Sequence, residues 1–138
     1  MRAVLLDTNA FTALFQGDLG VLDVVARADT VYASAIVIGE LEAGFRGGNR
    51  YASNIEVLDR FLAKASVETL PVSRETGECF GRVKQTLKSK GTPIPMNDVW
   101  LASQCMETGA ILVTFDRHFD VVDGLRLWAQ PEKSTPED

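Results

Sequence analysis

The sequence has one histidine and two cysteines among its 138 residues. Cys79 and Cys105 stand far apart and form no CxxC pair, which disfavours a zinc site and predicts two buried free thiols. No apolar run approaches the roughly 20 residues that a membrane-spanning helix needs. The start of the chain also lacks the charged, apolar and small-residue regions of a signal peptide. A cytoplasmic protein without a membrane anchor is therefore expected.

Basic charge is also in short supply, because the formal net charge is −5. This balance argues against nucleic-acid binding, in which contacts to phosphate dominate the affinity. The charge is uneven, however, and residues 46–90 hold nine Lys or Arg against five Asp or Glu. A cation bound among the acids elsewhere would change the local sign of the field. The net charge alone therefore does not exclude a nucleic-acid substrate.

Apolar stretches alternate with helix-type periodicity along the whole chain. Strands are predicted at residues 3–6, 31–33, 67–72, 110–114 and 125–128. Helices are predicted at residues 9–15, after Asp18, at 35–46, from Asn49 or Ser53 to 65, at 74–90 and from Asn97 or Asp98 to 108, with a short turn at 117–119. Asp18, Ser34 and Ser73 are the predicted capping residues, and Gly91 is predicted to end the helix at 74–90. Pro71 indicates that the strand at 67–72 is an edge strand or ends there. In the helix after Asp18, an apolar face is expected from Leu19, Leu22, Val25 and Ala26. The alternation favours one α/β domain over residues 1–130 with a mainly parallel sheet of four to five strands, followed by a polar, disordered tail at 131–138.

Four acids stand where parallel strands end or where the following helix begins. Asp7 directly follows the first strand, and Asp116 lies two residues beyond ILVT. Asp98 begins a helix after the loop TPIPMN. Glu40 lies six residues after Ser34 among apolar helical neighbours, which places it on or beside the buried face. Ligands of parallel sheets gather at the carboxyl ends of the strands, so these acids are candidates for one site.

Each acid also has a purely structural explanation. Asp7 and Asp98 suit helix caps or first-turn acids, Asp116 suits a turn, and Glu40 could pair with Arg46. Together they say more, because gathered carboxylates repel one another unless a cation neutralises them. Oxygen-only ligands suit Mg²⁺ or Mn²⁺, which can activate water and stabilise phosphate charge. The pattern points to phosphodiester or phosphomonoester chemistry without choosing between them.

Four motifs, in this order, resemble those of the PIN-domain ribonucleases: LLDTNAF, SAIVIGELEAGF, PIPMNDVWLAS and LVTFDRHF. More narrowly, the chain up to about Trp128 resembles the VapC-type toxins of toxin–antitoxin pairs. The resemblance implies a three-layer α/β/α fold, dependence on Mg²⁺ or Mn²⁺, and cleavage of RNA by metal-activated water. It also implies a cognate antitoxin, expected to contact residues 46–64, and a homodimer or a toxin–antitoxin hetero-oligomer.

The resemblance also assigns roles to individual residues. Asp7 and Asp98 would be the main metal ligands, and Glu40 and Asp116 would bind through water or complete a second metal position. His118 would be structural or touch RNA, rather than act as a general acid. Supporting hydrogen bonds are expected from Thr8, Asn9, Asn97 and Thr114.

Other functions share parts of this pattern. A haloacid-dehalogenase-like phosphatase needs a second acid two residues after the first, where this chain has Asn9, and no suitably placed lysine is evident. A PIN-domain nuclease of RNA processing, outside toxin–antitoxin systems, would carry the same acids. An inactive PIN-fold binding module is a further alternative, although all four acids are present. The sequence thus predicts a Mg²⁺-dependent endoribonuclease toxin as the leading hypothesis.

Overall fold

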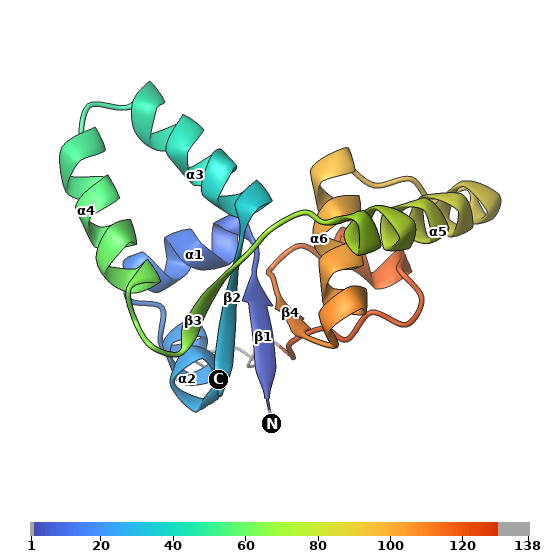
Figure 1. Ribbon diagram of the computed structural model, residues 1–138, viewed down its shortest axis with the longest axis horizontal. Coiled ribbons are helices and arrows are strands. Elements are labelled where there is room, and N and C mark those ends of the chain that lie inside the picture. The colour runs from blue at the N-terminus through green and yellow to red at the C-terminus, as the bar shows by residue number, and fades with distance from the viewer. Residues whose placement is uncertain (1, 130–138) are drawn as a thin grey trace, which may run out of the picture.

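A computed structural model describes residues 2–129, in which short strands alternate with helices (Figure 1). The strands are β1 (Ala3–Leu6), β2 (Thr30–Ser34), β3 (Val67–Leu70) and β4 (Ile111–Val113). The helices are α1 (Thr8–Phe15), α2 (Leu19–Arg27), α3 (Ala35–Gly47), α4 (Tyr51–Leu62), α5 (Arg74–Lys90) and α6 (Met96–Thr108), and a 3₁₀ helix follows at Arg117–Val121. The predicted tail at 131–138 lies outside the described residues, so the domain boundary stays a prediction.

The four strands form one parallel sheet in the order β3-β2-β1-β4. Val4 of β1 pairs with Val31 of β2 on one side and with Ile111 of β4 on the other. Val4, Leu5 and Leu6 are fully buried, as expected for a strand that is covered on both faces. All the carboxyl ends therefore meet at one edge of the sheet, as the α/β prediction requires.

Helices lie on both sides of the sheet. Figure 1 shows α1, α3 and α4 grouped at one side of the strands and α5 and α6 packed together at the other. This confirms the predicted α/β architecture with helices flanking a parallel sheet. None of the helices described in residues 2–129 is long and apolar enough to cross a membrane.

Helix starts follow the predicted capping residues. Asp18 accepts a hydrogen bond from the Val21 N–H at 3.0 Å, and Ser34 accepts one from the Ile36 N–H at 3.1 Å. Ser73 caps α5 in the same way, accepting from the Thr76 N–H at 3.2 Å. Each side-chain oxygen replaces a partner that the first turn of a helix lacks. These caps determine the residues at which α2, α3 and α5 begin.

One sequence prediction about an apolar segment was wrong, and a second did not say what its apolar face would contact. Residues 125–128 do not form a strand, because Leu127 makes only an isolated bridge to Leu112. In α2 the core-facing residues are Val21 and Val24, whereas Leu19 is 82% exposed. The predicted apolar face lies at the margin of the core, because Val25 packs partly against the core while Leu22 is 41% exposed.

The two cysteines are free thiols, and only one is fully buried as predicted. Cys105 is buried in α6, whereas Cys79 on α5 is partly exposed. Burial raises the pKa of the Cys105 thiol far above its ordinary value, although the positive charge of Arg126 opposes the shift. Cys105 is therefore an inert part of the core.

Candidate active site

The four predicted acids lie at the carboxyl edge of the sheet, each on a different segment. Asp7 ends β1 and caps α1, and Glu40 lies in the middle of α3. Asp98 lies in the first turn of α6, and Asp116 precedes the 3₁₀ helix that follows β4. Three crossovers of the chain are thus needed to bring these carboxylates to one place.

Asp7 is the most buried of the four acids, with 4% of its surface exposed. Its Oδ1 accepts the Ala10 N–H at 2.9 Å, so the helix-cap explanation is correct. Its Oδ2 accepts a hydrogen bond from the Thr114 hydroxyl at 2.5 Å. The Thr114 oxygen also accepts the Asp116 N–H at 3.0 Å. Thr114 therefore links the end of β1 to the turn after β4, in the supporting role predicted for it.

Glu40 is held by two of the predicted supporting residues. The Thr8 hydroxyl donates to its Oε1 at 2.6 Å, and the Asn97 amide donates to its Oε2 at 3.3 Å. Glu40 is exposed, so the prediction that it lies on or beside the buried face was wrong. The buried face of α3 runs through Val37 and Leu41, and Glu40 lies outside it.

Glu40 does not form the alternative pair with Arg46. The Arg46 guanidinium instead donates to Glu42 at 3.2 Å, one turn earlier on the same helix. Asn9, the remaining supporting candidate, is exposed in the first turn of α1. Glu40 is thus held within the acid site rather than by a surface ion pair.

The electrostatics of Asp7 reflect its crowded position. Burial raises the pKa of Asp7 above its ordinary value, and the negative charges of Asp116 and Asp98 raise it further. The hydrogen bonds from Thr114 and the Ala10 N–H act in the opposite direction. Asp7 thus carries a charge that its surroundings only partly compensate.

Asp98 experiences the same kind of repulsion. Partial burial raises its pKa, and the charges of Asp116 and Glu40 add to the effect. His118 opposes the shift, because its Nε2 lies 2.7 Å from Oδ2 of Asp98. The carboxylates are therefore close enough to influence one another's ionisation.

The donor set suits a hard divalent cation, but the carboxylates are not arranged to bind one as they stand. Within residues 2–129, no three His, Cys, Asp or Glu side chains form a group that could hold a metal ion. Hydrogen bonds engage both carboxylate oxygens of Asp7 and both of Glu40, whereas His118 engages only Oδ2 of Asp98. Oxygen ligands and an uncompensated negative charge fit Mg²⁺ or Mn²⁺ chemically. Cation binding would then require the carboxylates of Asp7 and Glu40 to turn.

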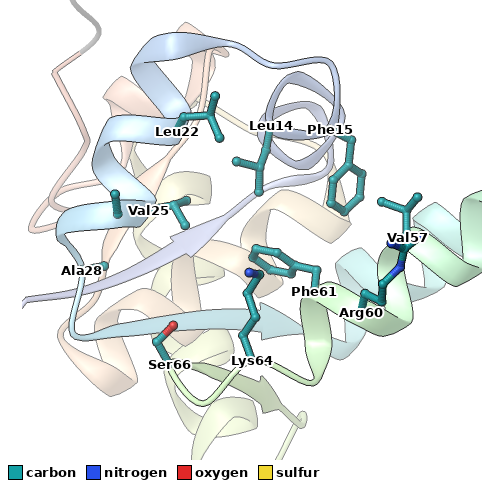
Figure 2. Close-up of a pocket in the computed structure, with 11 residues that line it drawn as sticks. Leu14, Phe15, Leu22, Val25, Ala28, Val57, Arg60, Phe61, Lys64 and Ser66 are labelled. Atoms are coloured by element: carbon teal, nitrogen blue, oxygen red, sulfur yellow. The ribbon is translucent and has the colours of Figure 1, made fainter.

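A separate apolar groove is lined by residues of α1, α2 and α4 (Figure 2). Its volume is about 920 Å³, and α1, α2 and α4 supply most of its walls. It is lined by Leu14, Phe15, Leu22, Val25, Ala26, Ala28, Val57, Arg60, Phe61, Lys64 and Ser66. Three of the four residues predicted to form the apolar face of α2 therefore line a groove rather than the core.

Sequence reasoning missed the contact between His118 and Asp98. The resemblance of TFDRHF to a family turn predicted that His118 is structural or touches RNA, and nothing in the spacing relates it to a side chain 20 positions earlier. The available signal was the proximity of His118 to Asp116, whose position at the sheet edge was predicted. The contact itself depends on how the 3₁₀ helix packs beside α6.

Comparisons with known proteins agree with this fold and these motifs. The PIN domain family matches residues 4–125. Ribonuclease VapC5 of Mycobacterium tuberculosis is 27% identical over 122 residues, which cover 88% of this chain and 89% of the relative. Ribonuclease VapC2 of Rickettsia felis is 31% identical over 93 residues, covering 67% of this chain and 68% of the relative.

Solved structures give the same result. The crystal structure of VapBC2 from Rickettsia felis, bound to a DNA fragment from their promoter, superposes with a TM-score of 0.81. That chain is 27% identical, and the alignment covers 94% of this chain and 99% of the other. The family match excludes the phosphatase alternative. The chain belongs to the PIN-domain family, and its curated relatives are VapC ribonucleases.

Proposed function

We propose that this protein is a divalent-cation-dependent endoribonuclease and the toxin of a toxin–antitoxin pair. The observation that carries the proposal is the group of four carboxylates at the carboxyl edge of a PIN-domain sheet, where neighbouring acids raise the pKa of Asp7 and of Asp98. The names of the curated relatives supply the substrate class, because they are ribonucleases. An RNA substrate places the proposed activity in the cytoplasm.

In this proposal Asp7 and Asp98 hold Mg²⁺ or Mn²⁺, while Glu40 and Asp116 bind it through water or complete a second position. When bound, the cation lowers the pKa of a water molecule and stabilises negative charge on the phosphate. The protein contributes orientation, because Thr114 and the Ala10 N–H fix the Asp7 carboxylate. The crowded carboxylates also leave a negative charge that favours the entry of a cation.

Asp98→Asn tests the catalytic assignment. With Mg²⁺ or Mn²⁺ the purified wild-type protein should cleave RNA, and the variant should be slower by at least ~100-fold, the scale of losing one charge-stabilising group. Asp23→Asn is a matched control, because Asp23 pairs with Arg27 on the exposed face of α2 and its loss should leave cleavage unchanged. Wild-type protein that cuts no RNA would support the inactive binding module instead.

Growth measurements separate a toxin from a nuclease of RNA processing. Expression of the chain alone should arrest growth, and co-expression of the protein encoded beside its gene should restore it. Asp98→Asn should be harmless when expressed at the same level. Normal growth at high levels of folded, RNA-cleaving protein would favour the RNA-processing alternative.

We further propose that the antitoxin binds in the apolar groove between α1, α2 and α4. The groove includes Val57, Arg60, Phe61 and Lys64, all within residues 46–64, where the sequence predicted antitoxin contact. Its apolar walls suit an amphipathic segment, and Figure 2 shows Lys64 reaching in beside Phe61. The two basic residues favour a segment that carries acidic groups. The homodimer expected from the resemblance stays a prediction.

Val57→Asp tests this location with a closely matched control. Val57 and Val72 are both 40% exposed, but Val72 does not line the groove. A charge at Val57 should weaken binding of the protein encoded beside this gene, whereas Val72→Asp should not, because an uncompensated charge in an apolar interface is costly. Equal binding by both variants would place the antitoxin elsewhere.

A further inference from the structure

The single histidine of the chain lies against one of the candidate metal ligands. Nε2 of His118 is 2.7 Å from Oδ2 of Asp98, and their side chains are 38% and 21% exposed. When Asp98 is ionised its carboxylate only accepts hydrogen bonds, and the imidazole nitrogen is then the donor in this contact. The neutral ring with its proton on Nε2 is sufficient for this role.

The His118 ring is held in place by its neighbour in the sequence. Its centroid lies 4.8 Å from that of Phe119, with the ring planes inclined at 39°. Phe119 is fully buried, and its carbonyl accepts the Val122 N–H at 3.0 Å. The 3₁₀ helix after Asp116 therefore places the imidazole on a fixed support.

The contact restrains one oxygen of Asp98 and leaves the other available. Within residues 2–129, Oδ1 of Asp98 has no hydrogen-bond partner, whereas Oδ2 faces His118. Partners that hydrogen-bond a metal-binding side chain fix its orientation, and their loss typically reduces metal affinity or activity by 10–100-fold. His118 is such a hydrogen-bond partner for Asp98.

We infer that His118 is a positioning residue of the acid site, which holds Asp98 through Oδ2 so that Oδ1 faces the cation. The inference rests on the proposed function, because it takes Asp98 as a metal ligand. It differs from the prediction that His118 is merely structural or touches RNA. It also gives the residue no part in proton transfer to the substrate.

Two substitutions separate the hydrogen bond from the packing. His118→Phe keeps an aromatic ring against Phe119 but removes the donor. His118→Gln loses the ring but places an amide donor near the position of Nε2. Arg117→Ala is the control, because Arg117 is exposed on the same turn and makes no contact with Asp98 among the described residues.

The measurement is calorimetric titration of the metal-free proteins with Mn²⁺ alone, so RNA cleavage does not enter the result. His118→Phe should bind Mn²⁺ about 10–100-fold more weakly than wild type. His118→Gln and Arg117→Ala should bind close to wild type. Wild-type affinity in His118→Phe would overturn the inference, as would an equal loss in His118→Gln, which would indicate packing or direct metal ligation. Wild-type protein that binds no Mn²⁺ would overturn both the inference and the proposed function.

A second measurement covers the case in which a variant at position 118 does not fold. Because the chain has one histidine, its imidazole nitrogens give a single set of NMR signals. In the metal-free protein Asp98→Asn should shift the Nε2 signal, since the charged acceptor is lost. An unchanged signal would show that the contact does not form in solution and would overturn the inference.

Discussion

Replacing Asp7 with Asn should stabilise the metal-free protein while removing its activity. Asn keeps the size of the side chain, and its oxygen can still accept the Ala10 N–H that caps α1. The contact with Thr114 survives with the amide as donor. What disappears is a buried negative charge that Asp98 and Asp116 repel. The variant should therefore unfold at a higher urea concentration than wild type near neutral pH.

Asp7→Ala provides the comparison that gives the effect its scale. Alanine loses the cap, which is worth about 1 kcal/mol, and leaves the Thr114 hydroxyl without its acceptor at a further cost of about 1–2 kcal/mol. Asn should therefore exceed Ala by about 2–3 kcal/mol, and each 1 kcal/mol corresponds to roughly 4 °C in Tm for a domain of this size. If Asp7→Asn unfolds at a lower urea concentration than wild type near neutral pH, the negative charge of Asp7 does not destabilise the folded protein and the reasoning fails.

The difference in stability between Asp7→Asn and wild type should change with pH in a defined direction. The pKa of Asp7 is higher in the folded protein than its ordinary value of 3.8. Ionisation in the folded state is therefore unfavourable, and the full cost is present once the pH exceeds the raised pKa. The stability gap between Asp7→Asn and wild type should be largest near neutral pH and close as the pH falls toward 3.8. Urea unfolding in EDTA across this range would measure it.

In the presence of Mg²⁺ the wild type should become more stable than Asp7→Asn, the reverse of their order without the cation. A ligand that binds only the folded state stabilises it by about 2.7 kcal/mol at 100 times its Kd. Wild type should gain this stability, and Asp7→Asn should gain much less because it has lost a ligand. An equal shift in both proteins would show that Asp7 does not contribute to cation binding.

Three further predictions concern the scaffold. Gln104→Leu should lower the free energy of unfolding by about 3 kcal/mol in urea denaturation, because the buried amide accepts from Ser34 at 2.6 Å and donates to the carbonyls of Leu70 and Pro71 at the end of β3. Alkylation followed by mass spectrometry should label Cys79 in the folded protein and leave Cys105 unmodified until urea is added, and early labelling of Cys105 would contradict its burial. Gly91→Ala should cost about 1 kcal/mol in the same unfolding assay, because φ at this position is 69° while nothing lies within 4 Å of an added Cβ; no loss would mean that the turn relaxes.

Local chemistry was sufficient to predict most elements of the fold. Ser34 and Ser73 precede apolar periodic segments, and each caps the helix expected there. Gly91 ends α5 in a left-handed conformation that only glycine adopts without strain. Pro71 indicated a strand end or sheet edge, and β3 is an edge strand. Caps, stops and buried strands depend on neighbours in sequence, so they were predictable.

Features that depend on packing between distant segments were not predictable. The apolar face of α2 was visible, but only the arrangement of α1 and α4 shows that Leu22 and Val25 line a groove. Glu40 was expected beside the core, yet Thr8 and Asn97 hold it at an exposed position. At the candidate site, the residue types and the sheet edge were predictable, whereas the partners of each carboxylate oxygen were not.

The pairing of β1 with β4 determines the stage of folding at which the acids of the proposed nuclease come together. Val4 must find Ile111, a contact that closes more than a hundred residues of chain and is slow to form. Asp7 and Asp116 flank that pairing, so the catalytic group is incomplete until the first and last strands have joined. Partly folded chains, which hold only the central strands, would lack activity. The proposed catalytic group would thus be complete only once β4 has joined β1.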